Sequence, residues 1–235
     1  MPHNRNQNLL IATLPRGDRL QLLSQCESIN LPLAQVLCEP GETTRHVYFP
    51  IDSFISLITQ IDDTRRLEVG MAGREGMLGV QLALGVARAP LRAMVQGAGA
   101  AWRMDATSFG DAIERSTALR HVLQKYVYVL MAQLSTSAAC LRFHAIGPRL
   151  ARWLLMSQDR AHADRFPVTQ EFLAKMLGVR RVGVTTAAGD LLRRGLITYH
   201  RGELTVLDRA GLEAAACSCF ATDLETYQRT MKFKV

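Results

Sequence analysis

The chain has 235 residues, of which 28 are Lys or Arg and 21 are Asp or Glu, so its formal net charge is +7 at pH 7. Hydrophobic residues make up 48% of the sequence and charged residues 21%, a balance typical of globular rather than disordered proteins. No apolar run approaches the length of about 18 residues that a membrane-spanning helix needs. The first eight residues are polar and the apolar run after them is short, so we expect no signal peptide and a cytoplasmic location.

Short extended segments separated by Gly and Pro follow a predicted helix over residues 15–26 and continue to about residue 104. Their close spacing and the turn signals between them predict a small all-β barrel or sandwich. The β-forming runs are 36–38, 46–49, 54–58, 66–69 and 93–95.

A single long helix is predicted between residues 117 and 142. Its apolar residues recur at intervals of three and four, close to the a/d seam of a coiled coil sustained over about three heptads. A helix of about 25 residues spans about 38 Å, which is long for packing against one small barrel. We therefore predict a homodimer interface on this helix, with an ordinary buried helix as the alternative. The predicted interface residues are Leu119, Leu123, Tyr126, Leu130, Leu134 and Leu141.

Residues 170–195 have the pattern of a helix-turn-helix. Two helices that cross closely need a small residue at the contact and a turn residue that tolerates positive φ, and Ala174 and Gly178 meet these needs. Thr169 is a candidate N-cap for the first helix. A helical hairpin without a nucleic-acid role is the alternative. The residues expected to face inward are Leu173, Leu177, Val179, Val184 and Ala187.

The second helix of this motif is expected to lie in the DNA major groove with its N-terminal residues facing base edges. Arginine can fork to guanine O6 and N7, and threonine can meet a thymine methyl group or a phosphate. Gly183 would either permit close approach to DNA or simply be tolerated, and Arg193 and Arg194 would either contact DNA or interact with the helix dipole. The predicted DNA-binding residues are Thr169, Gln170, Arg180, Arg181, Gly183, Thr185, Thr186 and Arg201.

Two short β-rich runs, 196–199 and 204–207, flank a turn that contains Gly202, which predicts a β-hairpin. Directly after a helix-turn-helix such a hairpin is a wing, and Arg201 at its tip would reach phosphate.

The distribution of charge along the chain agrees with a nucleic-acid partner. Residues 116–235 hold 17 Lys and Arg against 9 Asp and Glu, a net of +8, whereas residues 1–115 hold 11 against 12. Such a basic half suggests nucleic acid as partner, with a merely basic soluble domain as the alternative.

A last helix is predicted after residue 208, and it contains Cys217 and Cys219. The five cysteines of the chain fit neither a disulfide framework nor a four-cysteine zinc site. One residue between two cysteines is unusual for a structural zinc site. We therefore expect plain thiols, no metal site and no cofactor, with His46, His121 and His144 structural or solvated.

The order of these parts resembles the catabolite activator/fumarate-nitrate regulator (Crp/Fnr) superfamily of transcription regulators, over nearly the whole chain. The most specific segments are 169–171, 177–179 and 191–197, and 149–155 and 69–79 are similar to the family's first helix after the hinge and to its barrel. The resemblance implies an α+β fold with three parts. These are a cyclic-nucleotide-binding-like jelly-roll barrel over 1–116, a dimerisation helix and hinge over 117–146, and a winged helix-turn-helix over 147–235.

The resemblance implies a homodimer on a roughly palindromic operator in double-stranded DNA, with RNA polymerase as a further partner if the protein is an activator. An effector pocket in the barrel would signal through the long helix.

Arg181 matches a base-reading arginine of the catabolite activator pattern. Val182 replaces a glutamate of that pattern and Thr186 replaces a second arginine, so the operator should differ. The sequence contains no nucleophile elbow, phosphate-binding loop or zinc-protease motif, so we expect no enzyme. The alternative function is a ligand sensor of this fold that acts through a protein partner.

The barrel departs from the cyclic-nucleotide-binding members of this family. Those carry a Gly-Glu pair at the ribose and an Arg-Ser/Thr-Ala segment at the phosphate, whereas here Val80 follows Gly79 and Ala89 follows Arg88. A cyclic phosphate needs fixed donors, so we do not expect cAMP to bind in the usual way. A cyclic dinucleotide, a lipid-like ligand, a redox signal and no effector at all stay open. The candidate effector-binding residues are Gly79, Val80, Arg88 and Ser135, the last near the family's adenine-contacting hydroxyl.

Overall fold

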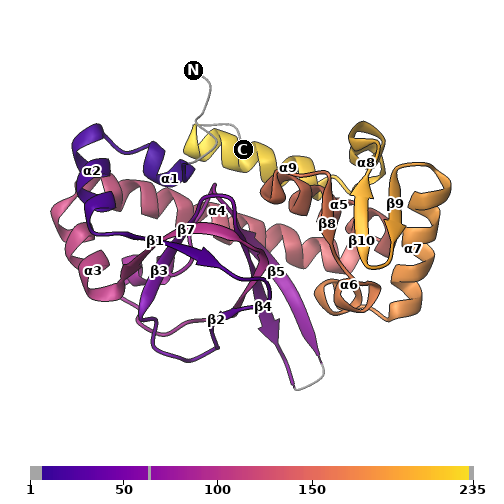
Figure 1. Ribbon diagram of the computed structural model, residues 1–235, viewed down its shortest axis with the longest axis horizontal. Helices are drawn as coiled ribbons and strands as arrows, with labels where there is room; N and C mark the ends of the chain where they lie inside the picture. The colour runs from indigo at the N-terminus through magenta and orange to yellow at the C-terminus, as the bar shows by residue number, and fades with distance from the viewer. Residues whose placement is uncertain (1–6, 63–64, 233–235) are drawn as a thin grey trace.

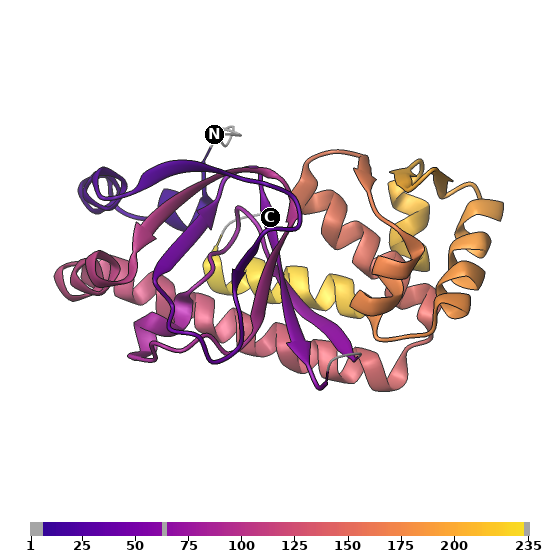
Figure 2. The same cartoon turned by 60° about the horizontal axis from the view of Figure 1, so that its bottom comes forward.

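The computed structural model describes residues 7–62 and 65–232 of the chain. A β-roll lies at one end of the molecule, and a helical domain with a small sheet lies at the other (Figure 1). The long helix α4, Thr117–Phe143, runs along the roll and ends beside the helical domain (Figure 2). The predicted order of barrel, long helix and winged helix-turn-helix is confirmed, as is the α+β fold class.

The roll consists of two antiparallel sheets in the described part of the chain, with strand orders β1-β7-β3 and β2-β6-β4-β5. Small and branched residues from both sheets, among them Ile55, Val95 and Ala101, fill the space between them. The strands are β1 Glu27–Leu31, β2 Val36–Cys38, β3 His46–Pro50, β4 Phe54–Gln60, β5 Arg66–Ala72, β6 Arg92–Gly97 and β7 Gly99–Asp105.

Short helices cover the roll before the chain enters α4. Helix α4 begins where the Ser116 hydroxyl accepts a hydrogen bond from the Leu119 amide at 3.0 Å, and it ends at His144. In the described ranges, no helix has both the length and the apolar character needed to cross a bilayer. The covering elements are α1 Leu9–Ala12, α2 Arg16–Ser24, the 3-10 helix η1 Val80–Leu84, and α3 Ala106–Arg115.

The second half of the chain builds a winged helix-turn-helix around a core centred on Leu150, Leu173 and Leu191. Its small antiparallel sheet has the order β8-β10-β9. Its elements are α5 Ile146–Ala161, β8 Arg165–Pro167, α6 Gln170–Leu177, α7 Arg181–Arg193, β9 Ile197–His200, β10 Glu203–Val206 and α8 Arg209–Ala215.

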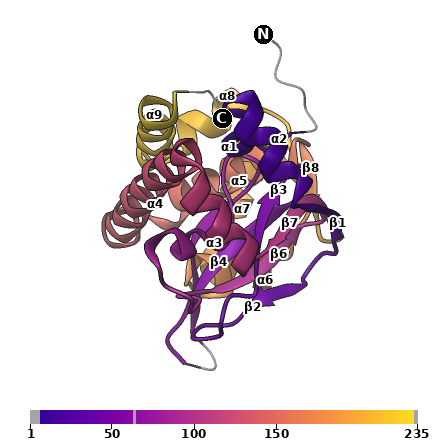
Figure 3. The same cartoon turned by 90° about the vertical axis from the view of Figure 1, so that its left-hand side faces the viewer.

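The chain does not end at the helical domain. Helix α9, Cys219–Met231, turns back and packs along α4 towards the roll (Figure 3). The Tyr227 hydroxyl donates a hydrogen bond to the Glu75 carbonyl, and Met231 joins the core beneath the roll. The predicted last helix is thus two helices, because the helical conformation is interrupted between Ala215 and Cys219.

Candidate nucleic-acid interface and effector pocket

The helix-turn-helix is held by the residues that the sequence marks for it. The Thr169 hydroxyl accepts a hydrogen bond from the Phe172 amide at 3.1 Å and so caps α6. Gly178 ends α6 with φ +62°, in the left-handed region. Leu173 and Val184 have no exposed surface, so the inner faces of α6 and α7 are fully packed against the domain core.

Replacing Gly178 by alanine should lower the free energy of unfolding by about 1–2 kcal/mol, because an L-residue is strained at this φ. The added Cβ would also lie 2.9 Å from Leu67 Cδ1. Urea unfolding followed by circular dichroism measures the loss. The matched control is Gly189→Ala within α7, whose Cβ would meet only the Arg193 guanidinium at 3.6 Å. The control should stabilise the helix by about 0.5–1 kcal/mol. Equal effects of the two substitutions would contradict this account.

The N-terminal end of α7 presents an exposed polar face. Arg180, Arg181, Thr185 and Thr186 are exposed, and the Thr185 hydroxyl lies 2.7 Å from the half-buried Gln170 amide oxygen on α6. This contact links the two helices on the side that faces solvent. The structure thus brings together the predicted residues of both helices into one surface, which we call the α7 face.

Charge pairing separates the arginines of this domain into two groups. Arg193 and Arg194 at the far end of α7 lie 3.3 and 3.7 Å from the Asp190 carboxylate. Within residues 7–62 and 65–232, Arg180 and Arg181 form no ion pair. Their charge is available to an external anion, whereas the charges of Arg193 and Arg194 are partly neutralised by an internal partner.

The wing carries Arg201 at its tip. Arg201 and Gly202 both have positive φ, 48° and 84°, which is the geometry of a type I′ two-residue turn between β9 and β10. Arg201 is exposed, and it too forms no ion pair in the described part of the chain. The predicted wing is therefore present with its cationic tip free.

Two of the predicted DNA-binding residues have another role in the fold. A Cβ at Gly183 would lie 2.6 Å from Ile146 Cδ1, so the missing side chain accommodates the start of α5. The half-buried Gly183 thus makes room for α5, which was neither of the two roles expected for it, and its contact with DNA stays a prediction. The Thr169 hydroxyl is engaged as the cap of α6.

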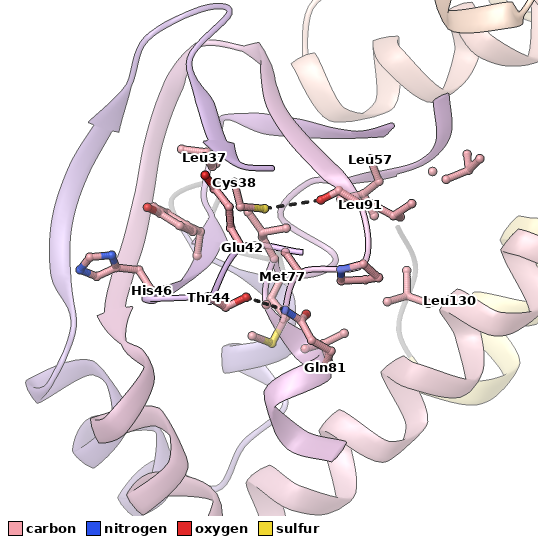
Figure 4. A pocket seen from close by; sticks show the side chains of 18 of the residues that line it. Leu37, Cys38, Glu42, Thr44, His46, Leu57, Met77, Gln81, Leu91 and Leu130 are labelled. Atoms are coloured by element: carbon pink, nitrogen blue, oxygen red, sulfur yellow. Dashed lines mark hydrogen bonds between the residues drawn. The ribbon is translucent and has the colours of Figure 1, made fainter. Parts of the chain in front are cut away.

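A cavity of about 470 Å³ opens in the roll between β-strands, η1 and α4 (Figure 4). Apolar side chains such as Leu57, Met77 and Leu130 line it together with polar and charged residues that include Glu42, Arg45 and His46. Thr44 and Gln81 form a polar pair on its wall, with the Gln81 amide donating to the Thr44 hydroxyl at 2.8 Å. Such a cavity, with apolar walls and several polar and charged groups, is suited to a small ligand that has both apolar and polar parts.

Sequence reasoning located only part of this cavity. Gly79 and Val80 line it, as expected. Arg88 is exposed and does not line it, because its guanidinium donates to the Gly41 carbonyl at 2.7 Å. Ser135 is exposed on α4, where its hydroxyl donates to the Met131 carbonyl at 3.0 Å. Both expectations are corrected. The missed lining residues Thr44 and Gln81 carry no sequence motif that would mark them.

The dimer seam predicted on α4 is also partly wrong. Leu119, Leu123 and Tyr126 are 3%, 0% and 2% exposed, because this face of α4 packs onto the roll's own core. They have no surface to offer a partner chain. Leu130 is half-buried against the same core, whereas Leu134 and Leu141 are 43% and 37% exposed.

A different apolar strip lies on the solvent side of α4. It repeats at intervals of four and three and includes Met131, which is 62% exposed. This repeat is the a/d spacing of a coiled coil, shifted by one position from the predicted seam in its first half. We call these residues the α4 strip: Val127, Met131, Leu134, Ala138 and Leu141.

Two carboxylates of the roll, the half-buried Glu68 and the buried Glu75, connect it to the helical domain. The Trp153 indole of α5 donates to Glu68 Oε1 at 2.8 Å, and the Ser56 hydroxyl donates to Glu68 Oε2 at 2.5 Å. The Arg160 guanidinium of α5 lies 2.7 Å from the Glu75 carboxylate, with both side chains buried. The position of the helical domain therefore depends on charged groups that are partly or fully buried at this junction.

Burial raises the pKa of Glu68 to about 7, although Ser56, Trp153, Arg160 and Arg152 favour its charged form. The folded state therefore binds this proton more tightly than the unfolded state does. The free energy of unfolding should fall by about 2–3 kcal/mol as pH rises from about 4.5 to about 7. Glu68→Gln should remove this part of the pH dependence and stabilise the protein at pH 8.

Denaturant unfolding at pH 5 and pH 8 tests the prediction for Glu68. The control Glu213→Gln changes an exposed carboxylate that pairs with Arg209 at 2.8 Å, and it should keep the wild-type dependence. If the free energy of unfolding of Glu68→Gln differs between pH 5 and pH 8 by as much as that of wild type, the assignment is contradicted.

Four potential metal ligands meet beside the end of α4, which the sequence did not predict. The ligand atoms of Cys140, His144, Cys217 and Cys219 all lie within 4.8 Å of one another. No pattern in the sequence indicates that these side chains lie together, and the expectation of plain thiols stays a prediction. These residues are distant in sequence, and only the return of the chain into α9 brings them together.

Comparison with known proteins agrees with this architecture. Residues 148–215 match the model of the Crp-like helix-turn-helix domain, and no curated protein matches the chain. Three solved structures share the fold, with TM-scores of 0.67, 0.66 and 0.64. A Crp/Fnr-family transcriptional regulator from Thermus thermophilus is 20% identical, with 81% of this chain and 98% of that chain covered.

The second structure is FixK2 from Bradyrhizobium japonicum, 13% identical, with 82% of this chain and 98% of that chain covered. The third is the c-di-GMP-responsive global regulator CLP of Xanthomonas campestris, 16% identical, with 82% and 99% covered. At these identities the structures establish the fold, and the domain match establishes the type of helix-turn-helix.

Proposed function

We propose that this chain, whose helix-turn-helix matches the Crp-like domain, is a transcription regulator of the Crp/Fnr type and not an enzyme. It would be a homodimer that binds a roughly palindromic DNA operator through the α7 face. The main support is the pair of exposed arginines at the N-terminal end of α7, which lack an internal ion pair among the described residues. The free Arg201 at the wing tip adds a contact for the phosphate backbone. Contacts of α7 with base edges would give sequence specificity, and contacts of the wing with phosphates would fix the position of the domain on the DNA.

Salt dependence tests DNA binding itself. Each phosphate neutralised by a protein cation contributes a slope of about −0.9 in log K against log salt. Fluorescence anisotropy with a labelled operator should show a steep negative slope, and Arg201→Ala should make it shallower by about one phosphate. Binding that does not respond to salt would favour a ligand sensor that acts through a protein partner.

We further propose that the α4 strip is the dimer interface. Apolar residues at a/d spacing on an exposed helix face are suited to pairing with the same helix of a second chain. A two-fold arrangement would hold two α7 faces one helical turn of DNA apart. RNA polymerase would be a further partner if the protein activates transcription.

We propose that the cavity in the roll binds the effector, and that the effector is not cAMP held in the usual way. Position 80 offers no carboxylate, and the Arg88 guanidinium is turned to the Gly41 carbonyl outside the cavity. Leu134 lines the cavity and also belongs to the α4 strip, so a bound ligand would touch the dimer helix directly. Calorimetric titration with cAMP should give no binding, and binding with a fixed stoichiometry would refute this point.

A further inference from the structure

The Cys140, His144, Cys217 and Cys219 cluster joins the end of α4 to the start of α9. Cys140 lies in the last turn of α4 and His144 follows four residues later as its C-cap, so both point to one side of the helix end. Cys217 precedes α9 and Cys219 is its first residue. All three thiols are buried, at 2%, 7% and 7% exposed.

The spacing of these side chains matches a tetrahedral ion site. The Cys140 and Cys217 sulfurs are 3.5 Å apart, and the Cys219 sulfur is 3.5 Å from His144 Nδ1. Zinc bonds of about 2.3 Å to sulfur and about 2.0–2.1 Å to nitrogen place tetrahedral ligands roughly 3.5–3.8 Å apart. Since all four atoms lie within 4.8 Å of one another, the space at their centre suits a single ion and not a cluster of several metals.

The environment also suits a negatively charged metal site. Three thiolates and one neutral imidazole around a divalent ion carry a net charge of −1. Arg149 and Arg152 line the same small cavity as Cys140. Arg152 already pairs with Asp223 at 2.6 Å, but Arg149 is buried and has no carboxylate partner in the described ranges. A metal–thiolate site beside it would supply the missing counter-charge.

A disulfide explains these contacts less well. A bond between Cys140 and Cys217 needs their sulfurs about 2.05 Å apart, and they are 3.5 Å apart. Such a disulfide would also not explain why Cys219 and His144 lie beside the Cys140 and Cys217 sulfurs. Three thiolates and an imidazole are a ligand set that zinc prefers.

We propose that Cys140, His144, Cys217 and Cys219 bind one Zn²⁺ ion per chain, and that this ion fastens α9 and the helical domain to the end of the long helix. The four ligands come from two segments that are more than 70 residues apart in the sequence. Their bonds to one ion would hold the end of α4 and the start of α9 together. Metal binding at this site does not depend on what the helix-turn-helix binds.

Metal analysis of the full-length protein, purified with reductant and dialysed against Zn²⁺, tests the site. Wild type should hold one zinc per chain, and Cys217→Ser and Cys219→Ser should each lose it. Cys26→Ser and Cys38→Ser are the matched controls, because these thiols lie outside the cluster, and both should keep the ion. Zinc retained by the Cys217→Ser/Cys219→Ser double variant, or no zinc in wild type, would overturn the proposal. Iron with inorganic sulfide, or a Cys140–Cys217 disulfide seen by mass spectrometry of the dialysed protein, would also overturn it.

A second measurement guards against variants that fail to fold. Removing metal from wild type with a chelator should lower the Tm, and added Zn²⁺ should restore it. Hydrogen exchange should become faster at the end of α4 and the start of α9 when the metal is removed. Substitution by Co²⁺ should give the visible bands of tetrahedral thiolate coordination. A Tm and exchange pattern that do not respond to metal would overturn the role of the ion as a fastener.

Discussion

Met131→Asp is expected to convert the protein from a dimer into a monomer and to abolish binding to a palindromic operator at working concentrations. Met131 is 62% exposed in the α4 strip, and a carboxylate there would face the paired helix of the second chain. Loss of the second half-site removes an avidity gain of about 10²–10⁴-fold. Analytical ultracentrifugation gives the mass, and anisotropy gives the affinity.

The matched control for Met131 is Leu20→Asp, which places the same charge on α2 at a leucine that is 56% exposed. The control should remain dimeric and keep its affinity. A Met131→Asp chain that still sediments as a dimer would reject the α4 strip as the interface. Circular dichroism of both variants should be unchanged, since neither side chain is part of the core.

Arg181→Ala is expected to weaken binding to the specific operator by about 1–3 kcal/mol, a roughly 5- to 150-fold loss, if the guanidinium forks to a guanine. Arg181 is exposed on the first turn of α7 and forms no ion pair among the described residues. Its contact with a base edge is lost on random DNA, so binding there should weaken much less. The ratio of the two affinities, measured by competition, reports the reading role.

Arg193→Ala serves as the control for Arg181. Arg193 lies at the opposite end of α7 and pairs with Asp190 at 3.3 Å. Its removal should leave the ratio of specific to random binding unchanged. An Arg181→Ala variant with an unchanged ratio would assign Arg181 to phosphate contact or to no contact, and base recognition to other residues of the α7 face.

The helix-turn-helix was predictable because its requirements are local. A cap, a small residue at the helix crossing and a positive-φ turn residue lie close together in the sequence, at Thr169, Ala174 and Gly178. Each can be recognised without knowing the rest of the fold. The role of Gly183 was not predictable, because Ile146, the residue that needs the space, lies on another helix.

The two faces of α4 show what periodicity leaves undetermined. The helix is apolar both towards the roll and towards solvent, so a heptad pattern starting at Leu119 and one passing through Met131 fit similarly well. Only the packing of the roll onto Leu119, Leu123 and Tyr126 decides which face is occupied within the chain. The first half of the predicted seam is therefore wrong, because these residues are buried within the chain, and dimerisation through α4 stays a prediction.

Long-range contacts explain the remaining differences. The orientation of Arg88 depends on the Gly41 carbonyl, which a family motif does not encode. Cys217 and Cys219 look like an isolated pair until α9 turns back along α4 and brings them to Cys140. Helix α3 had one local signal that was not used, the cap at Asp105, whose carboxylate accepts from the Ser108 amide at 2.9 Å.

Selection of genomic DNA fragments by the purified protein, with and without cAMP and cyclic di-GMP, tests the central claim most directly. The account predicts enrichment of one motif with two-fold symmetry, whose half-sites are centred about 10–10.5 base pairs apart. An Arg180→Ala/Arg181→Ala double variant should lose that enrichment. Fragments recovered without a shared symmetric motif would contradict the dimeric reading of an operator, and a motif that appears only with cAMP would contradict the assignment of the roll.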